Sequence, residues 1–227
     1  EGCGRLAERF AAADPKARVP WAGPDMSARS SISARLMETW AHAQAVYDVL
    51  GALGIAYTRH EHPPVFTLGA NASRAHLIAP GDIPVVQIDR GGQVTYHGPG
   101  QLVVYALIDL RRSGFGIRDF VAALERAVID LAAEFGIAAE GRRSAPGVYV
   151  AGAKLASVGV RVRRNGSYHG LALNVALDLE PFARINPCGY QGLRMTQLAT
   201  LGGPRSVWEC ADALEPHLRR ALGLPAA

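Results

Sequence analysis

The 227-residue sequence is poor in cysteine and lysine and has no long apolar run. Its three cysteines lie far apart with no CxxC pair, so neither a disulfide framework nor a zinc site is predicted. The longest apolar stretches, such as Leu102 to Ile108, are far shorter than the roughly 20 residues of a membrane-spanning helix. Charged residues precede any apolar run at the N-terminus, which does not resemble a secretory signal. We therefore expect a cytoplasmic protein with no metal site and no membrane partner.

The composition is that of an ordinary globular protein, with 49% hydrophobic and 19% charged residues. A net charge of +4 favours an acidic partner without specifying one. Residues 1–36 mix Ala, Gly, Pro, Ser and Arg with no sustained period, which predicts a poorly ordered leader. Since no internal repeat or second domain boundary is evident, residues 37–227 are expected to form a single catalytic domain.

Hydrophobic periodicity predicts an α+β fold, a mixed sheet flanked by helices. Helices are predicted over 37–53, 117–135 and 206–222, the last one starting with a capping box at Ser206. Strands are predicted over 85–88, 102–110, 147–150, 154–162 and 168–175. Asn165 and Gly166 between the last two strands are a hairpin-turn signal.

A glycine-rich loop is expected between the first two of these strands, over residues 90–101, and reads RGGQVTYHGPGQ. Glycines let the backbone approach a ligand closely, and free N–H groups and His97 could bind a carbonyl or an anion. The alternative is a purely structural glycine turn. The glycine spacing matches neither the dinucleotide-binding fingerprint nor the GxxxxGK[ST] phosphate loop.

Cys188 lies in Asn-Pro-Cys-Gly, where proline and glycine favour an exposed loop over a helix or strand interior. A cysteine in such a loop is placed for nucleophilic attack. Cys210 instead lies in a helical pattern and Cys3 in the leader, which favours a structural or incidental role for both.

A nucleophilic cysteine needs a neighbour that favours the thiolate or accepts its proton. Lys154 is a candidate, because the only other lysine is Lys16 and the remaining permanently basic residues are arginines, which effectively cannot lose a proton. A solvated lysine at a strand end is the alternative. His169 could line a substrate site, although a buried core histidine is favoured. His60 and His62 suggest a turn more than a metal site, because no further ligand accompanies them.

Five arginines are concentrated on segments that flank Lys154 in the sequence. This could be an ordinary solvated face or a docking surface for an acidic protein. They are Arg142, Arg143, Arg161, Arg163 and Arg164.

Four blocks, in this order, closely resemble the signature of the lipoyl(octanoyl) transferases, the lipoate-protein ligase B family. They are RGGQVTYHGPGQLVVY (90–105), GVYVAGAKLASVGVRVRR (147–164), YHGLALNV (168–175) and RINPCGY (184–190). The resemblance extends from about His62 to Gln197 and implies the fold of the biotin and lipoate protein ligase catalytic domain. It also implies an acyltransferase that acts without a cofactor.

By this resemblance, Cys188 is the nucleophile that carries the acyl thioester, and Lys154 activates it and carries protons. The implied donor is octanoyl-acyl carrier protein, and the acceptors are lipoyl domains of 2-oxoacid dehydrogenases and the glycine cleavage H protein. An apolar tunnel for the acyl chain is expected from Val104, Leu155, Val158 and Leu171. The implied substrate-binding residues are Arg90, Gly91, Gly92, Gln93, Val94, Thr95, Tyr96, His97, Ser157, Val158, Gly159, Gly170, Leu171 and Ala172.

Two other functions are considered. An ATP-dependent lipoate or biotin ligase of the same fold would form an acyl-adenylate and would not need Cys188. An aminoacyl-tRNA editing or binding module is suggested by the basic charge and by Leu50 to Thr67, which looks similar to the start of prolyl-tRNA editing proteins. On the main interpretation a nucleic-acid partner is not expected.

Overall fold

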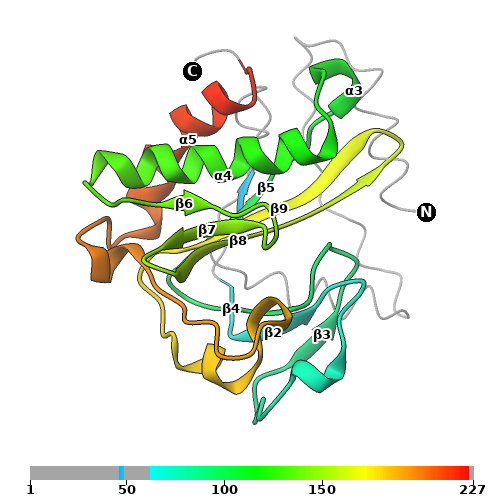
Figure 1. The fold of residues 1–227 in the computed structure, drawn as a ribbon, viewed down its shortest axis with the longest axis vertical. Coiled ribbons are helices and arrows are strands. Elements are labelled where there is room, and N and C mark those ends of the chain that lie inside the picture. The colour runs from blue at the N-terminus through cyan, green and yellow to red at the C-terminus, as the bar shows by residue number, and fades with distance from the viewer. Residues whose placement is uncertain (1–45, 49–61, 225–227) are drawn as a thin grey trace, which may run out of the picture.

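Two β-sheets of unequal size lie face to face, and two helices cover the outer side of the larger one (Figure 1). This computed structural model describes residues 46–48 and 62–224. In Figure 1 the helices α4 (Ile117–Glu134) and α5 (Val207–Ala221) lie above the six-stranded sheet, and the three-stranded sheet lies below it. The predicted α+β arrangement of a mixed sheet flanked by helices is confirmed.

The larger sheet has the strand order β1-β5-β9-β8-β7-β6. Its first pair, β1 and β5, is parallel, and its other neighbours are antiparallel. The long β8–β9 hairpin is tightened by Arg164 and Asn165, whose φ angles are 50° and 68°. The strands are β1 (Val46–Asp48), β5 (Gln101–Tyr105), β6 (Glu140–Gly141), β7 (Gly147–Val150), β8 (Ala153–Arg163) and β9 (Gly166–Asn174).

The predicted helices over 117–135 and 206–222 are confirmed as α4 and α5. Ser206 caps α5, because its hydroxyl accepts a hydrogen bond from the N–H of Glu209 at 3.4 Å. Both helices bury one apolar face on the large sheet and form the main core with it. The short helices are α3 (Leu110–Ser113), η2 (Arg74–His76), η3 (Glu180–Arg184), η4 (Pro187–Gly189) and η5 (Leu198–Leu201).

The smaller sheet has the order β3-β2-β4, and one of its faces packs against a second apolar core. Phe66, Tyr96 and Phe182 form its aromatic centre, with the rings of Tyr96 and Phe182 packed edge to face. Its strands are β2 (Val65–Leu68), β3 (Val85–Gln87) and β4 (Val94–His97). Because the two sheets have separate cores, the surfaces between them are free to carry polar groups.

Three secondary-structure predictions are corrected by the structure. The helix predicted over 37–53 is wrong at Val46–Asp48, which pairs as a strand with β5, and its remaining residues lie outside the described ranges. The loop predicted over 90–101 contains the buried strand β4, whose Val-Thr-Tyr-His sequence has strong β propensity. The strand predicted over 102–110 ends at Tyr105, and Asp109 caps the short helix α3 that begins at Leu110.

The apolar tunnel predicted from Val104, Leu155, Val158 and Leu171 is also wrong. Val104, Leu155 and Leu171 belong to the main core between the sheet and the helices, and Val158 packs against the same core. Side chains alternate between the two faces of a strand, so these residues point away from the smaller sheet. Within the described part of the chain, no helix is long and apolar enough to cross a membrane.

Candidate active site

Cys188 and Lys154, 34 positions apart in the sequence, meet at the end of the large sheet. The Lys154 ammonium donates a hydrogen bond to the Cys188 sulfur, with Nζ and Sγ 3.2 Å apart. Cys188 is half-buried in η4 and has a φ of 56°, a left-handed conformation that costs a non-glycine residue about 1–2 kcal/mol. Gly189 follows with a φ of 82°, so the loop turns sharply and presents the thiol. Asn-Pro-Cys-Gly thus forms a turn outside any long helix or strand, as predicted, but the turn is half-buried and not exposed.

Lys154 is a buried part of β8, with 1% of its surface exposed. Its backbone is held on one side by β7 and on the other by the segment after the cysteine loop. Lys154 donates its N–H to Arg194 O at 2.8 Å and accepts from Thr196 N–H at 2.9 Å. Its ammonium also donates to Pro146 O at 3.0 Å. The alternative of a solvated strand-end lysine is therefore wrong, and the lysine has a fixed position beside the thiol.

The charges around Lys154 favour its protonated form. Burial lowers the pKa of Lys154, but the Cys188 thiolate and Tyr149 act against burial, and the pKa ends above its usual value. The Lys154 ammonium lies 5.2 Å from the centre of the Tyr149 ring, within range of a cation–π contact. Tyr149 is itself fixed by a hydrogen bond from its hydroxyl to Ala145 O at 2.8 Å. The arrangement suits a thiolate paired with an ammonium.

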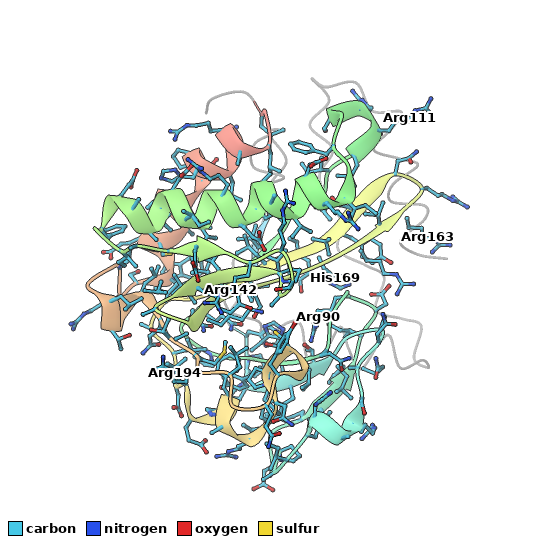
Figure 2. All side chains as sticks on the ribbon, in the orientation of Figure 1. Arg90, Arg111, Arg142, Arg163, His169 and Arg194 are labelled. Carbon is cyan, nitrogen blue, oxygen red and sulfur yellow. The ribbon has the colours of Figure 1, made fainter. Side chains whose placement is uncertain are left out.

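The segment that starts at Arg90 crosses the same sheet face next to β8. Gly91 donates its N–H to Val160 O at 3.3 Å, and a Cβ added at Gly159 would lie 3.0 Å from Gly91 O. Glycine is required here because the two backbones are too close for side chains. Figure 2 shows Arg90 between the two sheets. Two of the predicted site segments, 90–97 and 157–159, are thus brought together.

Arg90 carries a positive charge into this region. Its guanidinium donates to the carbonyl of Thr67 at 2.7 Å and to the Thr67 hydroxyl at 2.8 Å. Burial lowers the pKa of Arg90 to about 10, although the charge of the Cys188 thiolate works in the opposite direction. The Cys188 thiolate therefore interacts electrostatically with both Lys154 and Arg90.

A chain of buried polar side chains extends from Thr67 towards Lys154. His97 lies between the Thr67 hydroxyl, 3.2 Å from its Nε2, and Gln101 Oε1, 2.7 Å from its Nδ1. Gln101 donates to Asn174 Oδ1 at 2.9 Å, and Asn174 donates to Thr196 O at 2.9 Å. Burial lowers the pKa of His97 to about 3, so this histidine is neutral at physiological pH. The chain links the two sheets and ends on the segment that holds Lys154.

Not all of the predicted substrate-binding residues share one face. Val94 and Tyr96 point into the second core, whereas Thr95 and His97 alternate to the opposite side of β4. Leu171 and Val158 point towards the helices. Their neighbours Ser157, Gly170 and Ala172 alternate with them and face the smaller sheet.

Gln93 supports the cysteine loop. Its amide accepts from the N–H of Ser73 at 3.0 Å and donates to Asn71 O at 2.9 Å. A Cβ added at Gly189 would lie 3.1 Å from Cγ of Gln93, so the turn after Cys188 packs directly on this side chain. Gly92, with a φ of 90°, reverses the chain just before it. The glycines of this segment thus shape the backbone around the cysteine loop.

The remaining predicted candidates have separate positions. His169 is a half-buried histidine that contacts Asp89 through Nε2 at 2.8 Å. Cys210 is buried in the main core, which confirms its structural role, and burial raises the pKa of its thiol to about 12. Cys3 and His60 lie outside the described residues. His62 is buried and stacks near His97, with ring centres 5.5 Å apart.

The five clustered arginines lie on two parts of the large sheet, the β6–β7 connection and the end of the β8–β9 hairpin. Arg142 directly follows the edge strand β6, whereas Arg163 lies towards the tip of the β8–β9 hairpin (Figure 2). Arg142 is paired with Glu140 at 2.7 Å and lies over the Tyr149 ring, 4.4 Å from its centre. Residues close in sequence were separated because β7 and β8 are antiparallel, so the chain moves away from the site after Lys154. A docking surface for an acidic protein built from these arginines stays a prediction.

Four residues at the site were not predicted from the sequence. Thr67 and Asn174 are polar residues inside strands, where nothing in a local pattern marks them as buried partners. Tyr149 and Glu125 reach the site from β7 and α4 and resemble an ordinary strand tyrosine and helix glutamate. The burial of these polar groups depends on which faces pack together, and only the tertiary structure shows this.

Comparisons with known protein families give two matches. A family model described as the lipoyl protein ligase A/B catalytic domain matches residues 38–219. A second model, the mycothiol maleylpyruvate isomerase N-terminal domain, matches residues 1–47, nearly all of which lie outside the described ranges.

Curated relatives are similar over most of their length. An octanoyltransferase of Stutzerimonas stutzeri is 61% identical over 163 residues, covering 72% of this chain and 74% of the relative. One of Alkalilimnicola ehrlichii is 66% identical over 161 residues, covering 71% and 75%.

Solved structures share the fold at low identity. A lipoate-protein ligase A bound with ATP has a TM-score of 0.57 and 14% identity, over 80% of this chain and 85% of that one. A bipartite lipoate protein ligase of Thermoplasma acidophilum has a TM-score of 0.55 and 16% identity, over 74% and 71%. The chain therefore belongs to the octanoyltransferases of the lipoyl protein ligase A/B catalytic-domain family.

Proposed function

We propose that this acyltransferase moves an octanoyl group from acyl carrier protein to a lysine of a lipoyl domain through a thioester on Cys188. The observation that carries the proposal is the 3.2 Å contact between Nζ of buried Lys154 and Sγ of half-buried Cys188. A lysine held in this way can stabilise a thiolate and also give up a proton, whereas an arginine could not. The relatives named octanoyltransferase support the acyl group and the reaction class.

The reaction proceeds in two transfers. The Cys188 thiolate attacks the carbonyl carbon of the donor thioester, and the C–S bond to pantetheine breaks while Lys154 gives its proton to the departing sulfur. The amine of the acceptor lysine then attacks the new thioester. The C–S bond to Cys188 breaks, an amide forms, and Lys154 takes up the proton that the amine loses. Each step exchanges one acyl bond for another, so no external energy source is required.

The acyl group would bind on the face of the large sheet that is opposite the helices. Arg90, Gly91 and Gly159 lie on this face, where the backbones of Gly91 and Gly159 pack directly on each other beside the cysteine site. Arg90 and backbone N–H groups near the site can stabilise charge on a carbonyl oxygen. This placement replaces the tunnel predicted from Val104, Leu155, Val158 and Leu171, which are part of the main core or pack against it.

Lipoyl domains are the general class of acceptor that the family supports. We propose that the donor is acyl carrier protein, and that 2-oxoacid dehydrogenases and the glycine cleavage H protein supply the acceptors. A cytoplasmic location, action without a cofactor, and the division into a leader (1–36) and one catalytic domain (37–227) stay predictions. An ATP-dependent ligase is disfavoured, since the curated relatives at 58–66% identity are octanoyltransferases.

The test is intact-protein mass spectrometry after mixing the full chain with octanoyl-acyl carrier protein. An octanoyl adduct on the wild type that is absent in Cys188→Ala, and that an apo lipoyl domain removes, supports the proposal. Cys210→Ala is the matched control and should still form the adduct, because Cys210 is buried in the main core. Octanoylation of the lipoyl domain by Cys188→Ala at the wild-type rate would overturn it.

A further inference from the structure

Glu125 of helix α4 connects to Lys154 through a single peptide group. Its Oε1 accepts a hydrogen bond from the N–H of Gly147 at 2.6 Å. The carbonyl of the same peptide, Pro146 O, accepts from the Lys154 ammonium at 3.0 Å. Since Lys154 in turn contacts Cys188 at 3.2 Å, a continuous series of hydrogen bonds joins the carboxylate to the thiol.

Two glycines lie beside this series of hydrogen bonds, one next to Lys154 and one next to Glu125. A Cβ at Gly147 would lie 2.5 Å from Cε of Lys154 and 2.5 Å from Ala156 O, and φ at this residue is 135°. A Cβ at Gly141 would lie 3.0 Å from Oε2 of Glu125. Side chains at these two positions would displace the lysine or the carboxylate. Glycine at 147 and 141 thus leaves room for the Lys154 ammonium and the Glu125 carboxylate.

The physical effect of this connection is electrostatic. A carboxylate that accepts from the N–H of a peptide polarises the peptide, which makes its carbonyl a stronger acceptor for the ammonium. The 2.6 Å separation between Oε1 and the nitrogen is short for an N–H donor, as expected for a hydrogen bond to a charged carboxylate. The pKa of Glu125 is raised above its usual value because burial outweighs the Gly147 N–H and the charge of Lys154, both of which lower it. By reciprocity the carboxylate favours the ammonium form of Lys154.

We propose that Glu125 is a positioning residue, which holds the Lys154 ammonium against Cys188 through the Pro146–Gly147 peptide. When Cys188 becomes a thioester, Lys154 loses its anionic neighbour. The carbonyl of Pro146, polarised by Glu125, then keeps Nζ in place for the return of the proton. The inference deepens the proposed function and rests on it for this last step, whereas the effect on thiol reactivity does not depend on the identity of the substrate.

The charged and titratable groups that act on Lys154 come from three elements. Cys188 lies on η4, Tyr149 on β7 and Glu125 on α4, while Arg142 lies across the Tyr149 ring. Of these, Glu125 is separated from the thiol by the peptide and the lysine. Its charge would therefore act on Cys188 through Lys154. Removal of that charge should weaken the ammonium and so make the thiolate less stable.

The experiment measures the rate at which iodoacetamide alkylates Cys188 as a function of pH, by peptide mass spectrometry on the full-length chain. Glu125→Gln keeps an acceptor for the Gly147 N–H and removes the charge. We expect a rate at neutral pH that is roughly tenfold lower, and a midpoint shifted to higher pH, because the weakened ammonium stabilises the thiolate less. Glu125→Ala also removes the acceptor and should lose more.

Asp130→Asn is the matched control, since Asp130 lies on the same helix and pairs with Arg126 at 2.7 Å. Its alkylation profile should coincide with that of the wild type. The inference is overturned if the pH midpoint of Cys188 alkylation in Glu125→Gln is unchanged or lower. A negative charge that acted directly on the thiol, and not through Lys154, would disfavour the thiolate, so its removal would lower the midpoint. Urea unfolding of each variant separates a loss of folded protein from a change in reactivity.

The same variants separate failure of the inference from failure of the proposed function. If octanoyl-acyl carrier protein leaves no adduct on the wild type while Glu125→Gln shifts the alkylation profile, the function fails and the positioning role stands. If the adduct forms at an equal rate in the wild type and in Glu125→Gln, with equal alkylation profiles, the function stands and the inference fails.

Discussion

Lys154 combines deep burial with a retained charge, and the combination is what makes it useful beside a thiol. Removal from water disfavours the ammonium, so the lysine stays charged only because the thiolate and several fixed acceptors surround it. An ammonium that is stabilised by its partner rather than by water becomes a better acid when that partner reacts. Because the charge of Lys154 depends on the Cys188 thiolate, the lysine can lose its proton when Cys188 is acylated and regain it when the thiolate is released, as the proposed reaction requires.

Replacement of Lys154 should distinguish its two roles, the stabilisation of the thiolate by its charge and the transfer of a proton. Lys154→Met keeps much of the packing volume and should slow acylation of Cys188 by at least about a hundredfold, the usual contribution of a general acid. Lys154→Arg keeps the charge but has no transferable proton, so it should be comparably slow. Single-turnover acylation followed by intact mass measures both. A Lys154→Arg variant with near wild-type rate would show that the charge alone suffices.

The lowered pKa of buried His97 predicts that the protein loses stability in acid. Its pKa falls from 6.5 to about 3 on folding, mainly because burial disfavours the charged ring. The unfolded chain therefore binds more protons between these values, and the free energy of unfolding should decrease as pH falls from about 6.5 towards about 3, by up to about 5 kcal/mol. Burial also lowers the pKa values of His62 and His169, which adds to the same trend.

Urea unfolding at a series of pH values between neutral and mildly acidic checks this expectation. His97→Gln should be less stable at neutral pH, because it changes a buried hydrogen-bonded group, but its stability should depend less steeply on pH. An equal slope in the variant and the wild type would show that the other histidines or the carboxylates dominate the acid response.

Among the elements, α4, α5 and the β7–β9 strands could be predicted from the sequence, because each has a clear local pattern. The helix α4 has an apolar stripe, and β8 and β9 are joined by a recognisable turn. The strand β4 was missed, since its glycine-rich flanks suggested a loop while its own residues, Val94 to His97, favour a strand. Short strands of this kind are recognised mainly by their partner, here β2.

The β8–β9 turn offers a test at the level of one element. Arg164 and Asn165 both have positive φ and Arg163 pairs with Gly166, so the two-residue loop is one position earlier than Asn-Gly alone suggests. Asn165→Ala should lower the free energy of unfolding by about 1 kcal/mol, because alanine tolerates this conformation poorly. Asn165→Gly should restore it. Thermal or urea unfolding measures the difference, and equal stabilities of the three proteins would contradict the turn geometry.

At the scale of the whole molecule, the two sheets are connected by a buried polar chain between their separate cores. Asn174 joins Gln101 to Thr196 O, next to the backbone that holds Lys154. Polar groups buried in this way stabilise the protein only while each finds its partner. The site therefore depends on the relative position of the sheets.

Asn174→Leu should leave Thr196 O and the Gln101 amide without their side-chain partner and should cost roughly 2–4 kcal/mol of unfolding free energy. It should also slow Cys188 acylation, since the segment around Thr196 positions Lys154. Urea unfolding and single-turnover acylation give the two values. The exposed Asn71→Leu change is a control that removes no buried side-chain hydrogen bond. Full activity in a destabilised Asn174→Leu would show that the polar chain serves stability alone.

The sequence by itself determined the residue types of the site, the helices α4 and α5, and the hairpin that carries Lys154. These depend on local properties: a cysteine between proline and glycine, a lysine among arginines, and periodic apolar residues. Only the tertiary structure decided which face of the sheet the site uses, and that Glu125, Tyr149 and Thr67 take part. A strand presents side chains to both of its faces, and the packing of helices on one side assigns the other to the site. That assignment depends on contacts between residues distant in the chain, which no local pattern contains.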